Sequence, residues 1–245
     1  SCDLLDTPEP VGLPAEGFQM DFRSRRRLRR SPPRGPGGDD LISALHDDML
    51  LQILLCLRCT RAAARTGVLS RRWRGLWARL PDLTFRYVPP GGIEAALSRV
   101  ALPAAVSLLD IRFPGFSSTA WGKADDVRAK SLLRAAARLS PEELVFTLSS
   151  YNAVKPGRPV EIAMPCFRRA TSIELDTNRL RLKPPPAGQL PVLERLSLSG
   201  NIVDLGTMIS RCPRLRVLSV TFRDADPDSL EAALASLEAA AALGL

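Results

Sequence analysis

The 245-residue sequence contains a single histidine, His46, and no glycine-rich phosphate loop of the Walker or Rossmann type. A serine or cysteine nucleophile that relies on a histidine base would have to use His46. Adjacent acidic residues occur at Asp39-Asp40, Asp47-Asp48 and Asp125-Asp126, and such pairs are more typical of helix caps and solvated turns than of acid-base couples. We therefore predict a protein that is not an enzyme, and no spacing implies a cofactor.

Cysteines are few, and long apolar runs are missing. The five cysteines are an odd number without a secretory signal, which argues against a disulfide framework. Cys56 and Cys59 form a lone CxxC motif, whereas tetrahedral zinc needs four ligands, so we interpret both as small apolar side chains. Apolar stretches such as Met49 to Leu55 fall short of the roughly 18 residues of a membrane span. These absences predict an intracellular protein of the nucleus and/or cytoplasm without a membrane partner.

Arginine outnumbers lysine by 30 to 4, and the net charge of +8 is spread along the chain. Residues 1–38 are rich in Arg, Pro and Gly, and we predict a disordered arm. Its arginine cluster, Arg23 to Arg34, is either a nuclear import signal or a solvated arm without a specific role. The cluster also motivates nucleic-acid binding, which is the least favoured of the candidate functions.

The stretch VLSRRWRGLW, from Val68 to Trp77, interleaves basic and aromatic residues as nucleic-acid surfaces do. The same residues also fit a short helix, because Trp73, Leu76 and Trp77 are spaced i, i+3, i+4 and would share one side. We favour the helix. Its arginines would then lie mostly on the solvated side; they are Arg71, Arg72, Arg74 and Arg79.

Residues 39–79 are predicted to form three short helices. The capping candidates are Asp47 or Ser43 for the first helix, Thr60 for the second, which Gly67 would end, and Ser70 for the third. The first helix carries an i, i+4 stripe that predicts a buried face, formed by Leu45, Met49, Ile53 and Leu57 with Leu50 and Leu54 beside them. A unit of about 40 residues cannot bury all of this surface by itself. Some of it should contact a partner or the following domain.

The remainder of the chain contains an internal repeat. The frame Ala170-x-x-Ile173-x-Leu175-x-x-Asn178 recurs as Leu193-x-x-Leu196-x-Leu198-x-x-Asn201, and shorter copies start at Leu83, Leu109, Phe146 and Leu218. The steps between copies are 26, 37, 27, 23 and 22 residues, the period of leucine-rich repeats. We predict parallel strands with helical or irregular returns, and asparagines that hydrogen-bond backbone where the strand turns. A non-repeat βαβ sheet is the alternative.

Strand alternation places the leucines of each repeat in the core and the residues between them on the concave face. This face is a candidate binding surface, mixed and polar, without a recognisable pocket. Its residues are Ser172, Glu174, Asp176, Arg195, Ser197, Ser199, Val217, Ser219 and Thr221.

The segment from Asp39 to Phe85, which includes DDLISALHDDMLLQILL and VLSRRWRGLW, closely resembles the F-box of plant F-box/leucine-rich-repeat proteins, especially those of grasses. Downstream repeats such as CPRLRVLSV also resemble that family. The resemblance implies an α/β chain with a disordered arm (1–38), a three-helix F-box (39–80) and a leucine-rich-repeat solenoid of about six strands (81–245).

The same resemblance implies the substrate receptor of an SCF-type cullin ubiquitin ligase. In such proteins the F-box binds the Skp adaptor, and through it a cullin, while the repeats bind a target protein. Carried over by position, the adaptor-binding candidates are Leu45, Asp47, Leu50, Ile53, Leu54, Val68, Leu69, Trp73 and Trp77.

This sequence departs from the family pattern in two places and ends early. His46 stands where the family usually has proline at the start of the first helix, and Gly67 stands where serine is common. We expect the repeats to be truncated after an alanine-rich helix, Leu230 to Ala241. These departures leave a repeat scaffold without ligase function as the alternative.

Overall fold

The computed structural model describes residues 41–100, 106–113, 123–148 and 160–222, together with the helical positions Glu231, Ala235 and Glu238. Residues 42–245 form one compact unit. The predicted arm, residues 1–38, lies outside the described residues, as does most of the predicted helix from Leu230 to Ala241.

Short helices and turns precede the first strand. They are α1 (Leu41–Ala44), α2 (Asp47–Cys56), α3 (Thr60–Arg65) and two 3-10 helices, η1 (Thr66–Val68) and η2 (Leu76–Arg79). The predicted third α-helix is wrong, because turns follow Ser70 and lead into η2. Gly75 has a φ of +84°, a left-handed backbone that an α-helix cannot contain. Ser70 still caps the turn, since its Oγ accepts a hydrogen bond from Arg72 N–H at 3.2 Å.

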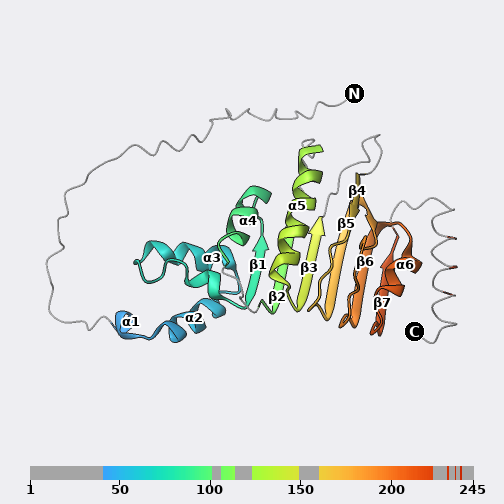
Figure 1. Cartoon of the computed structure of the whole chain (residues 1–245). Helices are drawn as coiled ribbons and strands as arrows, with labels where there is room; N and C mark the ends of the chain where they lie inside the picture. Colours follow the sequence, from blue (N-terminus) through green and yellow to red (C-terminus); the bar gives the residue numbers. More distant parts are fainter. Residues whose placement is uncertain are drawn as a thin grey trace, which may run out of the picture. The chain divides into compact units, whose positions relative to one another are not determined.

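Seven strands form one sheet in which every pair is parallel. They are β1 (Asp82–Arg86), β2 (Leu108–Phe113), β3 (Glu143–Leu148), β4 (Val160–Ala163), β5 (Ser172–Lys183), β6 (Arg195–Ile202) and β7 (Val217–Thr221). Figure 1 shows them side by side from β1 to β7, with β4 paired to the end of β5. The predicted α/β class and parallel repeat solenoid are confirmed.

Two rows of apolar side chains run across the sheet in register and form its core. The first row is Leu83, Leu109, Leu144, Ile173, Leu196 and Leu218, and the second is Phe85, Ile111, Phe146, Leu175, Leu198 and Val220. All are buried except those of β7, which are half-buried. Each repeat therefore buries its leucines mainly against its neighbours, as a solenoid requires.

The register corrects one predicted strand position. Leu144, rather than Phe146, lies opposite Leu109 and Ile173. A frame that is shifted by two residues keeps the same side chains inside, because alternation has a period of two. The sequence pattern could therefore identify the strand but not its register.

The predicted asparagine turns stay a prediction. Asn201 is the last residue but one of β6, where it is paired with Arg181 of β5. The ladder between β5 and β6 shifts between Thr177 and Arg181 and then continues. The side chain of Asn178 is outside the described residues.

Helices provide crossovers between parallel strands, which cannot be joined by tight hairpins. They are α4 (Pro90–Leu97) after β1, α5 (Lys123–Leu139) after β2 and α6 (Leu205–Ser210) after β6. Proline occupies the first position of α4, where its missing N–H and its fixed φ are tolerated. Within the described ranges, no helix combines the length and the apolar character needed to cross a membrane.

Candidate functional site

The structure divides the nine predicted adaptor-binding residues into two groups. Four are buried in one continuous core with the first strand: Leu50, Leu54, Trp73 and Trp77. Leu45 is half-buried and packs against that core. Ile53, Val68 and Leu69 are exposed, and Asp47 is half-exposed. Only the second group presents apolar side chains to solvent.

One helix carries both a buried and an exposed apolar stripe. On α2 and its C-cap, Leu50 and Leu54 face the core, whereas Met49, Ile53 and Leu57 are 54%, 44% and 42% exposed. The last three are spaced i, i+4, i+8 and so share one side of the helix; we call them the exposed stripe. The sequence pattern predicts a buried face that includes these three residues, and that prediction is wrong.

Met49 and Leu57 were missed as site candidates, although the sequence contained a signal for them. Apolar residues occupy two adjacent stripes of α2, which is more than a small three-helix unit can cover. A second exposed patch is formed by Val68, which is 85% exposed, and the neighbouring Leu69. Exposed apolar groups of this size mark surfaces that contact another molecule.

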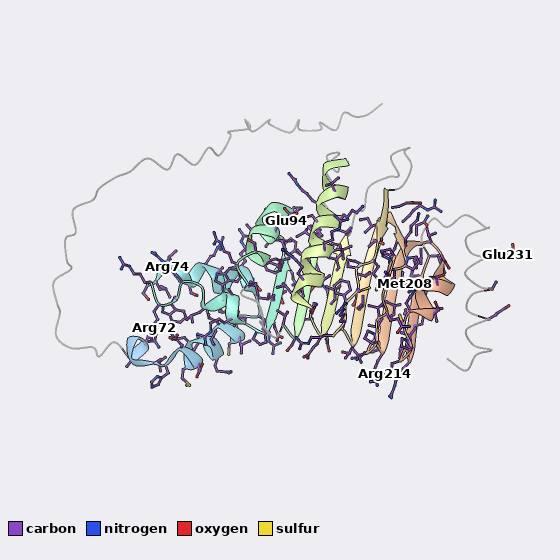
Figure 2. All side chains as sticks on the ribbon, in the orientation of Figure 1. Arg72, Arg74, Glu94, Met208, Arg214 and Glu231 are labelled. Atoms are coloured by element: carbon purple, nitrogen blue, oxygen red, sulfur yellow. The ribbon has the colours of Figure 1, made fainter. Side chains whose placement is uncertain are left out.

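Asp47, the first residue of α2, forms ion pairs with arginines of the segment that follows α3. Its Oδ1 accepts from Arg72 Nε at 2.8 Å, and its Oδ2 lies 3.5 Å from Arg79 Nη1. Asp47 is therefore not a cap, because the residue at the N-cap of α2 is His46. Two of the four arginines, Arg72 and Arg79, thus form ion pairs within the helical segment (residues 41–80), and Figure 2 shows Arg72 at that end of the molecule.

Thr60 connects α3 to the sheet. It is the first residue of α3 and not its cap, since Cys59 occupies the N-cap. The Thr60 hydroxyl is buried and accepts a hydrogen bond from the backbone N–H of Thr84 in β1 at 2.8 Å. Because β1 is the terminal strand of the sheet, this bond satisfies an edge donor and fixes the helical segment against the repeats.

His46 has a backbone that proline could adopt. Its φ of −68° and ψ of 155° are extended values, and its carbonyl accepts from the N–H groups of Met49 and Leu50. The imidazole is exposed and makes no capping hydrogen bond to α2. The start of α2 therefore has the geometry of the proline found in the resembled family.

The nine predicted target-binding residues form three aligned rows on the open face of the sheet. The rows are Ser172, Arg195 and Val217; Glu174, Ser197 and Ser219; and Asp176, Ser199 and Thr221. All nine are exposed or half-buried, in contrast to the leucines between them. Their placement on one face is as predicted, whereas their role in binding stays a prediction.

Sequence reasoning missed a charged cluster on the same face. Asp110 is buried, and its carboxylate accepts from Arg112 Nε at 2.8 Å and from Arg86 Nη2 at 3.1 Å. The hydrogen bond to Asp110 raises the pKa of Arg112, and partial burial opposes that shift. Asp110 and Arg112 are two residues apart in β2, and this spacing places both on the open face. The cluster fixes two exposed guanidinium groups beside the predicted target-binding rows.

Metal and thiol chemistry find little support in the part of the chain that the structure describes. No group of three or more His, Cys, Asp or Glu side chains could hold a metal ion there. Cys56 is exposed and Cys59 is half-buried, both as free thiols. Cys212 is buried, and burial raises the pKa of its thiol to about 11, which keeps it protonated and unreactive at neutral pH.

Comparison with known proteins finds relatives over part of the chain. An F-box/LRR-repeat protein of Arabidopsis thaliana is 39% identical over 88 residues, which are 35% of this chain and 18% of that protein. F-box/LRR-repeat protein 25 of the same plant is 37% identical over 78 residues, 32% of this chain and 26% of that protein. A putative F-box/FBD/LRR-repeat protein of A. thaliana is 51% identical over 47 residues, 19% of this chain and 10% of that protein.

These matches cover about a tenth to a quarter of the length of the curated relatives. No family model matches the chain, and no solved structure matches it. The relatives nevertheless agree with the helical segment and the repeat sheet in naming both an F-box and leucine-rich repeats. The resemblance to plant proteins of this kind is confirmed.

Proposed function

We propose that this chain, a plant F-box/leucine-rich-repeat protein, is the substrate-recognition subunit of an SCF-type cullin ubiquitin ligase. In this proposal the F-box, residues 39–80, binds a Skp-type adaptor and through it a cullin. The repeat domain, residues 81–245, binds the target protein. The chain acts as a non-catalytic adaptor, and its proposed location is the nucleus and/or the cytoplasm.

The exposed stripe of α2 is the observation that carries the adaptor proposal. Met49, Ile53 and Leu57 remain in contact with water although the neighbouring Leu50 and Leu54 are buried. Full burial of an exposed side chain of this size is worth roughly 1.5–3 kcal/mol, and these three, which are already about half covered, would gain about half of that. A helical adaptor surface that covers the stripe would supply this stabilisation, in the manner of a helix that lays its apolar face in a groove.

The packing behind the stripe supports a preformed docking surface. The Asp47 ion pairs hold the start of α2, and the Thr60–Thr84 hydrogen bond holds α3 against the sheet. Trp73 and Trp77 fill the interior between them. A surface that is already ordered loses less conformational entropy on binding, so more of its contact energy appears as affinity.

The open face of the repeat sheet is the proposed target-binding surface. It combines the three predicted polar rows with the guanidinium groups that Asp110 holds in place. A surface of serine, threonine and paired charges suits recognition of a polar protein segment through hydrogen bonds.

A pull-down with a plant Skp-type adaptor tests the proposal. The full chain is co-expressed with the adaptor, as wild type and as the Ile53→Asp variant. An aspartate in the middle of the stripe would become a buried charge without a partner when the adaptor covers it, and this burial costs free energy. We expect Ile53→Asp to weaken adaptor binding by at least about tenfold, a loss of about 1.4 kcal/mol.

Val127→Asp is the matched control, because Val127 is 67% exposed but lies on α5, outside the F-box. It should retain the adaptor as well as the wild type does. A wild-type chain that retains no adaptor, with no rescue by His46→Pro, would refute the ligase role and favour the scaffold alternative. Equal losses in both variants would refute the assignment of the stripe.

A further inference from the structure

Two sites of opposite charge lie on the open face of the repeat sheet, opposite its buried rows. The positive site is formed by Arg86 of β1 and Arg112 of β2, which are register partners. The negative site is formed by the exposed Glu174 of β5. Glu174 lies in the same row across the sheet as Asp110, which is two residues before Arg112 on β2. The open face therefore changes sign between β2 and β5.

A buried carboxylate holds the positive site in place. Asp110 is 4% exposed and accepts hydrogen bonds from both guanidinium groups, Arg112 Nε and Arg86 Nη2. The arginine side chains remain 46% and 56% exposed, and their other N–H groups make no hydrogen bond or ion pair with the residues that the structure describes. Two positive charges against one negative charge leave a net positive charge. An anionic group from another molecule would accept charge-assisted hydrogen bonds from donors that are already positioned.

The carboxylate of Glu174 is available at the negative site. It forms no hydrogen bond and no ion pair within the described part of the chain. Its charge still reaches the positive site: the hydrogen bond to Asp110 is the main cause of the raised pKa of Arg112, burial opposes it, and the charges of Asp110 and Glu174 add to it. Asp176, two residues further along β5, is on the same face and adds a second carboxylate. This part of the face therefore attracts a cation.

An uncharged strand sets the distance between the two sites. Val145 and Thr147 of β3 lie in register between β2 and β5 in the two charged rows. Neighbouring strands are about 4.8 Å apart, so two strand spacings amount to about 10 Å. Three residues in the polyproline II conformation, a major conformer of unfolded chains, span about 9 Å and bring side chains i and i+3 to the same side. An extended segment that crosses the strands would thus place two such side chains over the two sites.

We propose that the open face binds an extended target segment in which an aspartate or glutamate and a lysine or arginine are three positions apart. The acidic side chain contacts Arg86 and Arg112, and the basic side chain contacts Glu174. This inference rests on the proposed target-binding role of the face and specifies the chemistry of the target. A segment with the two charges exchanged would bring like charges together, so the face also selects the direction in which the segment crosses the strands.

Selection from a phage-displayed library of random twelve-residue peptides, with the full chain as bait, tests the proposal. We expect the enriched peptides to share an acidic and a basic residue three positions apart. Glu174→Lys should change the enriched pattern to two acidic residues at that spacing. Arg86→Gln, which keeps the shorter hydrogen bond between Asp110 and Arg112, should weaken the preference for the acidic residue. Arg214→Glu is the matched control, because Arg214 is exposed but lies before β7, where the strands begin (Figure 2), and should keep the wild-type pattern.

Fluorescence anisotropy with one enriched peptide gives the magnitude. We expect Glu174→Lys to weaken binding of this peptide at least about tenfold, because it brings two cations together. Replacement of the basic residue of the peptide by glutamate should restore binding to Glu174→Lys and abolish it with the wild type. Absence of this exchange would overturn the proposed contact.

Ser197→Tyr separates this inference from the proposed role of the face. Ser197 is the register partner of Glu174 in β6, and a tyrosine side chain there would obstruct the open face whatever the charge of the ligand. Enriched peptides that this variant rejects, but that lack the charge spacing, would overturn the inference and leave the target-binding role of the face intact. Peptides that bind the variant as well as the wild type would overturn both, as would a library from which no peptide is enriched. The adaptor pull-down tests the F-box and is independent of all these outcomes.

Discussion

Replacement of Trp73 by alanine should destabilise the whole F-box rather than remove one adaptor contact. Trp73 is 8% exposed and belongs to the same core as Leu50, Leu54 and the first strand. Removal of a buried tryptophan side chain costs about 3–5 kcal/mol, which combines lost transfer energy with the cavity left behind. That cost is a large fraction of the roughly 5–15 kcal/mol that stabilises a typical domain.

The expected loss translates into a measurable change in unfolding temperature. For units of 150–250 residues, 1 kcal/mol corresponds to about 2–4 °C, so Trp73→Ala should lower the melting temperature by about 6–20 °C. Circular dichroism of the purified full chain measures this directly. Ile53→Asp, at an exposed position, should shift the melting temperature by only a few degrees while it weakens adaptor binding.

Comparison of the two variants shows whether Trp73 acts through the stability of the F-box or through direct contact with the adaptor. If Trp73→Ala left the melting temperature unchanged and still abolished adaptor binding, Trp73 would be a contact residue, and its placement in the core would be wrong. If Ile53→Asp unfolded the chain, the exposed stripe would instead be part of the core. Adaptor binding by Trp73→Ala must therefore be compared below its own melting temperature.

Two further predictions concern helix starts. His46→Pro should raise the free energy of unfolding by about 0.4–1 kcal/mol, because the φ of −68° already suits proline; a lower urea midpoint would contradict this. Asp204→Ala should lower stability by about 0.5–2 kcal/mol, because Asp204 caps α6 through Thr207 N–H. A hydrogen bond with the Thr207 side chain, and then this backbone hydrogen bond, lower the pKa of Asp204 in the folded chain. The cap is therefore fully present above the unfolded pKa and is lost as pH falls through the lower folded value. The difference in stability between wild type and variant, measured by urea unfolding, should shrink below about pH 4; a difference that grows in acid would contradict the assignment.

The repeats could be predicted from the sequence because their signal is repeated and redundant. The nine-residue frames around Ile173 and Leu196 share one pattern, and the structure pairs them in register. The register of β3 could not be predicted in this way, because alternation alone cannot decide whether Leu144 or Phe146 lies opposite the neighbouring strands' first core residue.

The site was harder to predict because it depends on which of two equivalent stripes meets η2. Leu50 and Ile53 are equally apolar, and both have apolar partners four residues along the helix. The packing of α2 against η2 decides that Leu50 is buried and Ile53 is not. The cluster of Arg86, Asp110 and Arg112 was missed for the same reason, since Arg86 comes from a different strand and reaches Asp110 only across the sheet.

The size of the F-box explains why its surface is divided in this way. A unit of about 40 residues cannot bury two tryptophans and two apolar stripes by itself. Leu50, Leu54, Trp73 and Trp77 share one core with β1, and α2 packs against η2. The other side of α2 carries the exposed stripe, which is the proposed adaptor surface. Packing within the chain and the proposed adaptor contact therefore use different stripes of the same helix. This arrangement predicts that substitutions such as Ile53→Asp and Trp73→Ala have additive effects on unfolding, because the two side chains lie in separate surroundings.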